Sequence, residues 1–487
     1  MQSYDLVVIG GGPGGYRTAI VAAHLGARVA LVERARPGGT CLNQGCIPKK
    51  SLLHLASLLE DVAALQGRGL AGDVRGDLLA ALEHKDRVVA GIRDNFPLWL
   101  RRLGIHYLAG DARLAGRGCV QVHLHQSAPS ATGRAQTLSA ARIVLAPGSH
   151  ALALDAGGAG NGLMGTSQQF MEELQRVPGR VLCVGAGPIG VEFGYLFHQF
   201  GAEVHVVERE ERILPRSTLS DRACQTLLRK LERIGIQVKR GVEALRFTPQ
   251  GAEMQVAFSD GSRGCYDYVL AGVGRRAATQ GLGLAAAGVE CDSQGFILTD
   301  ACLQTSAPGI YAVGDAKRCP MPAPMTANSA LHDAKVAASN AVEDKAVRVN
   351  YLKVPFVVHS ALEIAQVGLT EEQAEAAGFE PEVARSTLAG CGKARACHDF
   401  EGYVEMVHDG ETGQMLGGTI VGPEAGEQVH MLSAALQSTA GMWFFKDMSY
   451  SHPSWCEELE TAVESHAAEL ARRANPLFKP GILAGLA

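Results

Sequence analysis

The sequence lacks the features that mark membrane-spanning and nucleic-acid-binding proteins. No stretch approaches the roughly 18 uninterrupted apolar residues that a membrane-spanning helix needs. There is no long basic run, and the formal net charge is −5 with both signs interspersed. Phosphate backbones and anionic headgroups would therefore meet no basic stripe. We expect neither a nucleic-acid partner nor a membrane span.

The sequence also lacks room for a leader and the cysteine pattern of a small secreted protein. Residues 1–5 run directly into the apolar segment 6–9 and a glycine loop, so no signal peptide fits and we expect a cytoplasmic protein. The twelve cysteines are scattered through a large chain rather than set in a compact framework. Most, such as Cys183, should be buried thiols.

What the chain does have is the size and composition of a multidomain α/β protein. At 487 residues it is too long for one hydrophobic core. A hydrophobic content of 47% and 58 glycines suit a globular α/β architecture with many tight turns.

The N-terminal segment predicts a dinucleotide-binding unit. An apolar strand over 6–9 precedes three glycines in the G-x-G-x-x-G spacing, Gly10, Gly12 and Gly15. The first glycine permits the turn, the second lets backbone N–H groups approach a pyrophosphate, and the third lets the helix over 16–25 pack on the strand. A second strand over 28–32 ends at Glu33, whose carboxylate can accept hydrogen bonds from both hydroxyls of an adenosine ribose.

The same unit recurs in the middle of the chain. An apolar strand over 181–184 precedes three glycines in the same spacing, Gly185, Gly187 and Gly190. A second strand over 204–207 ends at the acid Glu208. The first glycine and the acid are 23 residues apart in both copies. Two dinucleotides are therefore predicted. A carboxylate at Glu208 repels the 2′-phosphate of NADP and pairs with a free 2′-hydroxyl, and Arg209 is the only cation nearby, so we predict NAD here.

Cys41 and Cys46 differ from the other cysteines in their surroundings. Four residues separate them, so one helical turn and a little strain can bring the two sulfurs within bonding distance. Lys49, Lys50 and the N-terminus of the following helix favour a thiolate. The alternatives are a zinc half-site or two inert thiols, but we find no second Cys/His pair at ligand spacing and expect no metal site.

The C-terminal third predicts an α+β domain with a candidate base. Strands over 354–358, 402–407 and 415–421 are followed by helices around 425–436 and 457–471. His452 lies five residues before Glu457 on a loop leading into the last helix. The carboxylate can reach back to one ring nitrogen, which fixes the tautomer and raises the basicity of the other. Taken alone, a His-Pro pair is more often a surface turn.

The segment 38–48, Gly-Gly-Thr-Cys-Leu-Asn-Gln-Gly-Cys-Ile-Pro, closely resembles the redox-active segment of class I flavoprotein (pyridine nucleotide) disulfide oxidoreductases. Similar segments at 190–192, 305–316 and 452–457 extend the resemblance over essentially the whole chain. It implies an α/β fold with two Rossmann-like dinucleotide-binding domains and a C-terminal α+β interface (dimerisation) domain. The implied limits are 1–150 and 276–350 for FAD binding, 151–275 for NAD binding, and 351–487 for the interface domain.

The resemblance also implies which residues bind each cofactor. Those expected to bind FAD are Gly10, Gly12, Pro13, Gly14, Gly15, Glu33, Gly39, Thr40, Lys50, Ala112, Gly148, Asp315, Met325, Thr326 and Ala327. Those expected to bind NAD are Gly185, Gly187, Ile189, Gly190, Glu192, Glu208 and Gly274.

For catalysis, the resemblance implies that Cys46 contacts the flavin and Cys41 attacks the substrate. Glu192 resembles the family carboxylate that pairs with a lysine near flavin N5. Our first candidate for this lysine is Lys50 and our second is Lys49. His452, held by Glu457, would serve Cys41 of the other subunit, so that activity requires a homodimer.

The function implied is the oxidation of a dihydrolipoyl dithiol through the Cys41–Cys46 disulfide and FAD to NAD⁺, as in dihydrolipoyl dehydrogenases. One alternative is an NAD(P)H-dependent reductase of the glutathione or mercuric type. The Lys49-Lys50 pair resembles that branch more closely, although the C-terminal cysteine pair expected for mercury reduction is absent from 475–487. Another alternative is a mainly structural or binding subunit of a multienzyme complex.

Four residues depart from the usual dihydrolipoyl dehydrogenase pattern: Pro147, Asn328, Tyr450 and Cys456. The last three are expected near the flavin or the substrate channel. We hypothesise a specialised paralogue that serves a lipoyl protein outside the main 2-oxo acid complexes.

Overall fold

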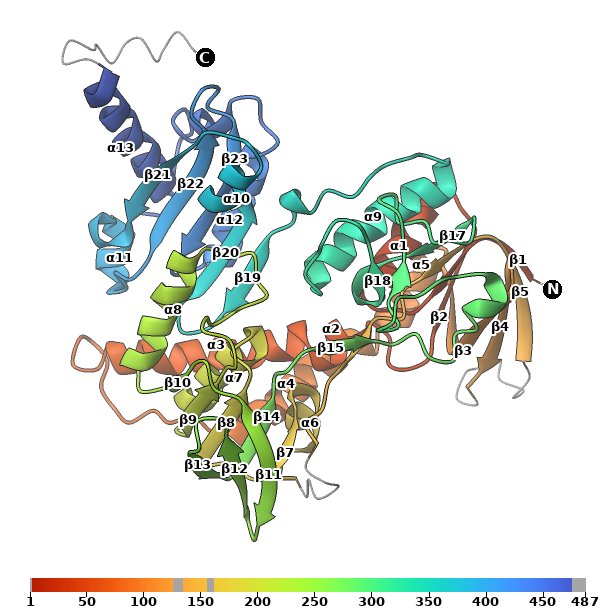
Figure 1. Ribbon diagram of the computed structural model, residues 1–487, viewed down its shortest axis with the longest axis horizontal. Helices are drawn as coiled ribbons and strands as arrows, with labels where there is room; N and C mark the ends of the chain where they lie inside the picture. The colour runs from red at the N-terminus through yellow and green to blue at the C-terminus, as the bar shows by residue number, and fades with distance from the viewer. Residues whose placement is uncertain (1, 126–134, 156–161, 475–487) are drawn as a thin grey trace.

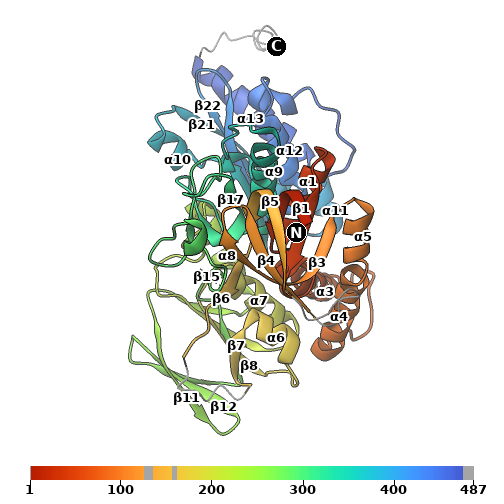
Figure 2. The same ribbon diagram turned by 90° about the vertical axis from the view of Figure 1, so that its right-hand side faces the viewer.

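Three large β-sheets organise the chain (Figures 1 and 2). The computed structural model describes residues 2–125, 135–155 and 162–474. None of the helices within these ranges is long and apolar enough to cross a membrane.

The first sheet is built mainly from the N-terminal part of the chain. Its parallel strands lie in the order β3 (His106–Gly116), β2 (Val29–Glu33), β1 (Gln2–Ile9), β5 (Ala135–Leu145) and β17 (Ile310–Ala312). Strand β4 (Cys119–Leu124) pairs antiparallel with the outer parts of β3 and β5. In β1, Leu6 and Val8 pack on helices α1 (Pro13–His24) and α9 (Ala327–Glu343), and Val7 and Ile9 pack on the opposite core. Residues 6–9 of this strand are all apolar because both faces of this part of the strand are buried.

The second sheet repeats this plan. Its five parallel strands lie in the order β10 (Gln237–Lys239), β9 (Glu203–Val207), β8 (Arg180–Val184), β14 (Tyr268–Ala271) and β7 (Met164–Thr166). Helices α6 (Ser167–Glu173), α7 (Pro188–Gln199) and α8 (Asp221–Arg233) pack on it, and an antiparallel sheet of β11 (Ala244–Gln250), β12 (Glu253–Phe258) and β13 (Arg263–Tyr266) lies alongside. The predicted helix over 16–25 begins earlier, at Pro13, and α7 likewise begins at Pro188. Proline suits a first helical position because its fixed φ is already helical and no N–H is lost.

One long helix connects the two units. Helix α3 (Cys46–Ala64) follows α2 (Gly39–Gln44) in the N-terminal segment, and α4 (Leu78–Arg93) follows it. Its buried face, with Leu52 and Ala56, belongs to the same core as Phe193 and Phe197 of α7 in the second unit. In Figure 1, α3 runs beside α7. Cys46 is therefore held where the first and second units meet.

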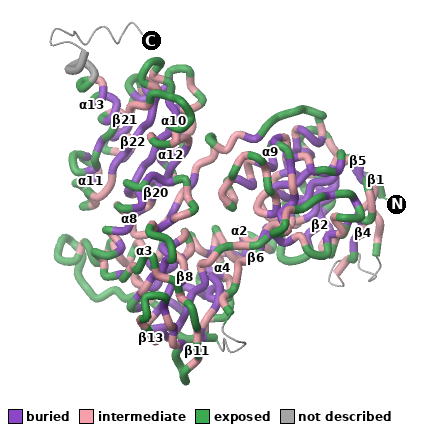
Figure 3. Tube along the Cα trace, viewed as in Figure 1, coloured by how far each residue is buried: buried purple, intermediate pink, exposed green. Residues whose placement is uncertain are grey.

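The third sheet is antiparallel and lies in the C-terminal third. Its strands follow the order β19 (Phe356–His359), β20 (Glu363–Gly368), β23 (Met415–Val421), β22 (Tyr403–Asp409) and β21 (Pro381–Thr387). Helices α12 (Ala425–Ala435) and α13 (Glu457–Ala474) cover one face, and they begin at the residues predicted for them. Figure 3 shows the buried strands of this sheet between more exposed helices and loops. The predicted fold class is confirmed.

Short elements complete the fold. They are α5 (Phe96–Arg102), β6 (Ser149–Ala151), β15 (Arg275–Ala277), β16 (Ile297–Leu298), β18 (Lys317–Arg318), α10 (Glu371–Ala376) and α11 (Gly392–Cys397), with 3₁₀ turns at 285–287, 314–316, 351–353, 388–390 and 441–445. Strands β6 and β15 pair antiparallel where the chain passes between the first two units.

Candidate active site

A cavity of about 1640 Å³ lies where the three units meet. Its wall includes both glycine loops, the two cysteines at α2 and α3, and residues of β19 and α12. This volume exceeds the roughly 300–1,000 Å³ of an ordinary small-molecule pocket. It can therefore hold more than one large ligand.

The two glycine loops have the same geometry. A Cβ on Gly12 would meet only the Cα of Gly39, at 3.9 Å, and one on Gly187 would meet nothing within 4 Å. These second glycines therefore leave space in which a pyrophosphate can approach the backbone. A Cβ on the third glycine would lie 1.7 Å from the Gly10 carbonyl oxygen in the first loop, and 1.8 Å from the corresponding oxygen in the second. The third glycines thus permit the close packing that the spacing predicts.

The two acids also fix the loops, a role that sequence reasoning missed. Glu33 Oε2 accepts a hydrogen bond from the Gly11 N–H at 2.6 Å, and Glu208 Oε2 accepts one from the Ala186 N–H at 2.8 Å. In both copies the other carboxylate oxygen accepts the N–H two residues further on. Both acids line the cavity, and a carboxylate oxygen has a further lone pair for a ribose hydroxyl. The residues present therefore fit two dinucleotides.

The structure brings nearly all of the predicted cofactor-binding residues to this cavity. Those in its wall are Gly10, Gly12, Pro13, Gly14, Glu33, Gly39, Thr40, Lys50, Ala112, Gly148, Asp315, Met325, Thr326 and Ala327 for FAD, and Gly185, Gly187, Ile189, Glu192, Glu208 and Gly274 for NAD. Gly15 and Gly190 lie behind the wall, packed against the first glycine of each loop.

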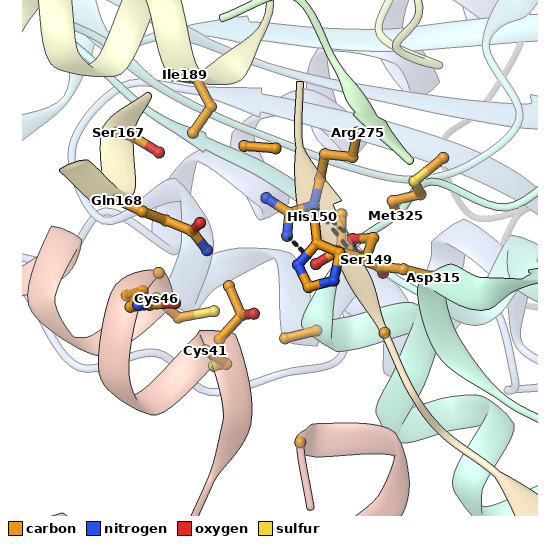
Figure 4. Close-up of a pocket in the computed structure, with 18 of the residues that line it drawn as sticks. Cys41, Cys46, Ser149, His150, Ser167, Gln168, Ile189, Arg275, Asp315 and Met325 are labelled. Carbon is orange, nitrogen blue, oxygen red and sulfur yellow. Dashed lines mark hydrogen bonds and ion pairs between the residues drawn. The ribbon is translucent and has the colours of Figure 1, made fainter. Parts of the chain in front are cut away.

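Asp315 has two partners that sequence reasoning did not select. The Ser149 hydroxyl donates to Asp315 Oδ2 at 2.6 Å, and Arg275 Nε donates to the Ser149 hydroxyl at 2.6 Å. Arg275 also lies 3.6 Å from the same carboxylate oxygen. Figure 4 shows this group on the side of the pocket facing the cysteines. Because Ser149 and Arg275 are 126 residues apart, no local pattern could have linked them.

The two cysteines lie on consecutive helices at the cavity wall, and both are thiols in this structure. A hydrogen bond from the Cys41 thiol, reinforced by the charge of Lys49, lowers the pKa of Cys46 to about 7. The same hydrogen bond, together with burial, raises the pKa of Cys41. Cys46 also begins α3, where the helix dipole favours a negative charge. Cys46 is thus the residue of the pair that carries the thiolate.

Lys49, and not Lys50, pairs with Glu192. Lys49 Nζ lies 2.6 Å from Glu192 Oε2, and the other oxygen of this carboxylate, which is only 1% exposed, accepts the His359 N–H at 2.9 Å. Lys50 is 58% exposed and lies 3.3 Å from Glu363. The prediction that placed Lys50 first is therefore wrong. Consecutive helical residues point about 100° apart, and the packing of α3 on α7 turns Lys49 towards the buried carboxylate.

His452 and Glu457 have the geometry that their spacing predicts. His452 Nδ1 lies 2.8 Å from Glu457 Oε1, while Glu457 Oε2 accepts the Ser454 N–H at 2.6 Å. The hydrogen bond from His452 lowers the pKa of Glu457. The imidazole is 79% exposed, and among the described residues neither member of the pair lines the cavity that contains Cys41.

Within the part of the chain that the structure describes, two of the four departures from the usual pattern line the cavity, whereas Tyr450 and Cys456, which were expected near the flavin or the substrate channel, do not. Pro147 and Asn328 lie in the cavity wall, and the Asn328 amide donates to the Pro355 carbonyl at 3.0 Å. The Tyr450 hydroxyl donates to the carbonyl of residue 445 at 2.8 Å. Burial raises the pKa of Cys456 and so disfavours its thiolate.

Comparison with known proteins agrees with this geometry. Residues 4–334 match the model of the pyridine nucleotide-disulphide oxidoreductases, and residues 354–463 match the dimerisation domain of that family. A dihydrolipoyl dehydrogenase of Thermus scotoductus is 36% identical over 96% of this chain and 98% of its own length. Dihydrolipoyl dehydrogenase 3 of Pseudomonas aeruginosa is 35% identical over 95% and 98%, respectively.

Solved structures show the same architecture. The HOCl-induced flavoprotein disulfide reductase RclA of Escherichia coli, in a Cu(II) complex, superposes with a TM-score of 0.81 at 25% identity and covers 96% of this chain and all of its own. LpdA of Mycobacterium tuberculosis superposes with a TM-score of 0.86 at 23% identity, over 96% of this chain and all of its own.

Fold, site and relatives define a flavin-dependent disulfide oxidoreductase with two dinucleotide sites. The chain belongs to the pyridine nucleotide-disulphide oxidoreductase family. Within it, the chain is an enzyme of the dihydrolipoyl dehydrogenase type, with FAD and NAD as cofactors.

Proposed function

We propose that this enzyme oxidises a dihydrolipoyl group, free or carried on a protein, and that Cys41 and Cys46 form the working redox pair. The observation that carries the proposal is the position of the two thiols, Cys41 on α2 and Cys46 at the start of α3, in the wall shared by the two dinucleotide cradles. We assign FAD to the Gly10 loop and NAD to the Gly185 loop. Bound FAD and NAD supply the hydride chemistry that re-oxidises the pair.

The sulfur chemistry proceeds on the protein's own residues. One substrate thiolate attacks Cys41 Sγ of the oxidised pair, the Cys41–Cys46 bond breaks, and Cys46 leaves as a thiolate. A leaving group with a pKa of about 7 departs readily at neutral pH. The second substrate thiol then attacks the bound substrate sulfur and Cys41 leaves, so the dithiol becomes a disulfide and two electrons remain on the cysteine pair.

The base in this scheme is His452 of the partner subunit. It accepts the proton of the substrate thiol and so creates the nucleophilic thiolate. Three findings support this assignment: the exposed imidazole, its bond to Glu457, and its place in a dimerisation domain outside the cavity of its own chain.

Mixed dimers test the shared site. We expect Cys41→Ser and His452→Gln homodimers to be nearly inactive with dihydrolipoamide. Co-refolding the two variants should restore about a quarter of the wild-type rate, because half of the dimers are mixed and each of these has one intact site. A mixture as inactive as its components would contradict the shared site.

NAD is favoured at the second cradle by charge. Glu208 lines the cavity beside the second glycine loop, and the neighbouring Arg209 is paired with Glu210 at 3.3 Å. Comparing dihydrolipoamide oxidation by NAD⁺ with glutathione disulfide reduction by NADPH tests substrate and cofactor together. We expect the first reaction to be faster by orders of magnitude, and a preference for the second would overturn the proposal.

The proposal also includes the limits of the three units and the cellular role of the enzyme. We propose the limits 1–150 with 276–350, 151–275 and 351–487 for the FAD, NAD and interface units, supported by the strands that each sheet contains. We also propose that the enzyme is cytoplasmic and that it oxidises a lipoyl protein outside the main 2-oxo acid complexes. Ordinary rates with standard 2-oxo acid complexes would remove the reason for a specialised role.

A further inference from the structure

A second group of chemically active side chains lies in the third unit, outside the active-site cavity. It consists of Glu382 on β21, His408 on β22 and His466 on α13. The Nε2 atoms of the two histidines are 2.9 Å apart, and His466 Nε2 is 3.2 Å from Glu382 Oε2. Three potential ligand atoms from three separate elements thus meet at one place.

The tautomer of His408 follows from its other nitrogen. His408 Nδ1 lies 3.1 Å from the Asp409 carbonyl oxygen. A carbonyl can only accept, so Nδ1 carries the hydrogen and Nε2 presents a lone pair to His466. A ring that donates one N–H to a backbone carbonyl and directs the other nitrogen inward is typical of a histidine that binds a metal.

The hydrogen between the two rings marks the position of a cation. Since His408 Nε2 accepts, His466 Nε2 must donate, and Glu382 Oε2 is a second acceptor near the same hydrogen. All three ligand atoms lie within 4.8 Å of one another. Replacing this proton by a divalent cation would leave two imidazole nitrogens and one carboxylate oxygen directed at a common centre.

We propose that Glu382, His408 and His466 form a binding site for a zinc-class divalent cation. Two ligand atoms on a tetrahedral zinc ion are about 3.3 Å apart. The observed 2.9 and 3.2 Å lie within a few tenths of an ångström of this value, and the third pair, His408 with Glu382, lies within 4.8 Å. Two imidazoles with one carboxylate suit zinc better than magnesium or calcium, which prefer oxygen ligands alone. The imidazoles are buried and Glu382 is 32% exposed, so the cation enters from the carboxylate side, where water completes the coordination.

The proposed metal site would help to hold the helix that positions His452, the proposed base. Helix α13 begins at Glu457, the residue that holds His452, and His466 is on the same helix. A cation bound by β21, β22 and α13 would fasten this helix to the sheet. From the sequence we expected no metal site, because we found no second Cys/His pair at ligand spacing. The three residues of this site are far apart in the chain and match no spaced motif.

Titration of the oxidised holoenzyme with Zn²⁺, in competition with a chromophoric chelator, tests the proposal. We expect one tightly bound Zn²⁺ per chain, a higher thermal unfolding midpoint with Zn²⁺, and nitrogen and oxygen but no sulfur ligands at the zinc X-ray absorption edge. Glu382→Gln, at a partly exposed position, should weaken binding at least tenfold. His466→Ala should abolish it.

Glu380→Gln is the matched control, since it removes the same charge two residues away from an exposed position. It should bind Zn²⁺ like the wild type. Oxidation of dihydrolipoamide by each zinc-free variant reports whether the fold is intact. The proposal would be overturned by any of three results. These are sulfur ligands in the zinc X-ray absorption spectrum, no stoichiometric Zn²⁺ binding by the wild type, or equal Zn²⁺ affinities in the Glu382→Gln and wild-type proteins. None of these results would bear on the redox role of the cysteines.

Discussion

The two adjacent lysines of α3 should respond very differently to the same substitution. Lys49→Met leaves the carboxylate of Glu192 buried without its ion partner, whereas Lys50→Met removes an exposed contact with Glu363. Methionine keeps the length and helix propensity of lysine. The two variants therefore differ only in the contacts that the ammonium groups make.

The structure sets the size of the effect. Removing one partner of a buried ion pair costs about 3–5 kcal/mol. Lys49 is 20% exposed and Glu192 keeps the bond from His359, so we expect a loss of about 2–3 kcal/mol in the free energy of unfolding. For Lys50 the expected loss is at most about 1 kcal/mol, because its ammonium group is exposed and Glu363 keeps its contacts with His359 and the Gly426 N–H.

Lys49 also supports the thiolate of Cys46, whose pKa is about 7. Losing one nearby positive charge should raise this pKa by about one unit. At pH 7 the ionised fraction of the reduced enzyme would fall from about a half to about a tenth. The pKa rises because only the charged form of Cys46 loses a favourable interaction.

Urea unfolding and the pH dependence of Cys46 alkylation measure both effects. The alkylation rate of the reduced enzyme, followed by mass spectrometry of the peptide containing Cys46, should have its midpoint about one unit higher in Lys49→Met and unchanged in Lys50→Met. An equal or larger shift in Lys50→Met would refute the assignment of Lys49. An unchanged midpoint in Lys49→Met would refute the electrostatic reasoning.

Three further perturbations follow from the same contacts. Burial raises the pKa of Glu363, but hydrogen bonds and charge from His359, the Gly426 N–H and Lys50 outweigh it and bring the value to about 2 from the ordinary 4.5. A depressed folded-state pKa stabilises the protein above pH 4.5, and this contribution, about 3 kcal/mol, is lost as the pH falls towards 2. Urea titrations across this range should show a flatter pH dependence in Glu363→Gln. His452→Gln should lower turnover with dihydrolipoamide by about 10²–10⁴-fold while reduction of an artificial electron acceptor by NADH persists, and loss of both activities would point to a folding defect. Glu208→Gln should raise the KM for NAD⁺ about tenfold, because it removes a charged acceptor for the ribose hydroxyls. It also weakens the hydrogen bond from the Ala186 N–H that fixes the glycine loop. An unaltered KM would show that Glu208 does not contact the nucleotide.

Local sequence patterns were sufficient to predict those parts of the site whose residues lie close together in the sequence. The glycine loops with their acids, the cysteine pair, and the five-residue spacing of His452 and Glu457 each require only a turn or one helical segment to form. Apolar runs of the right length were likewise enough to identify the first two parallel strands of each glycine-loop unit, because a strand segment buried on both faces has no polar alternation.

Only the tertiary structure decided between Lys49 and Lys50, because the rotation of α3 is set by its packing on α7, more than a hundred residues away in the sequence. The same holds for Arg275 with Ser149 and Asp315, and for Glu382 with His408 and His466. Sequence by itself thus determined which chemical groups the chain contains and how neighbouring residues are arranged. Which distant groups come into contact depends on how whole faces of helices and sheets bury their apolar surface, and side-chain spacing along the chain does not encode that directly.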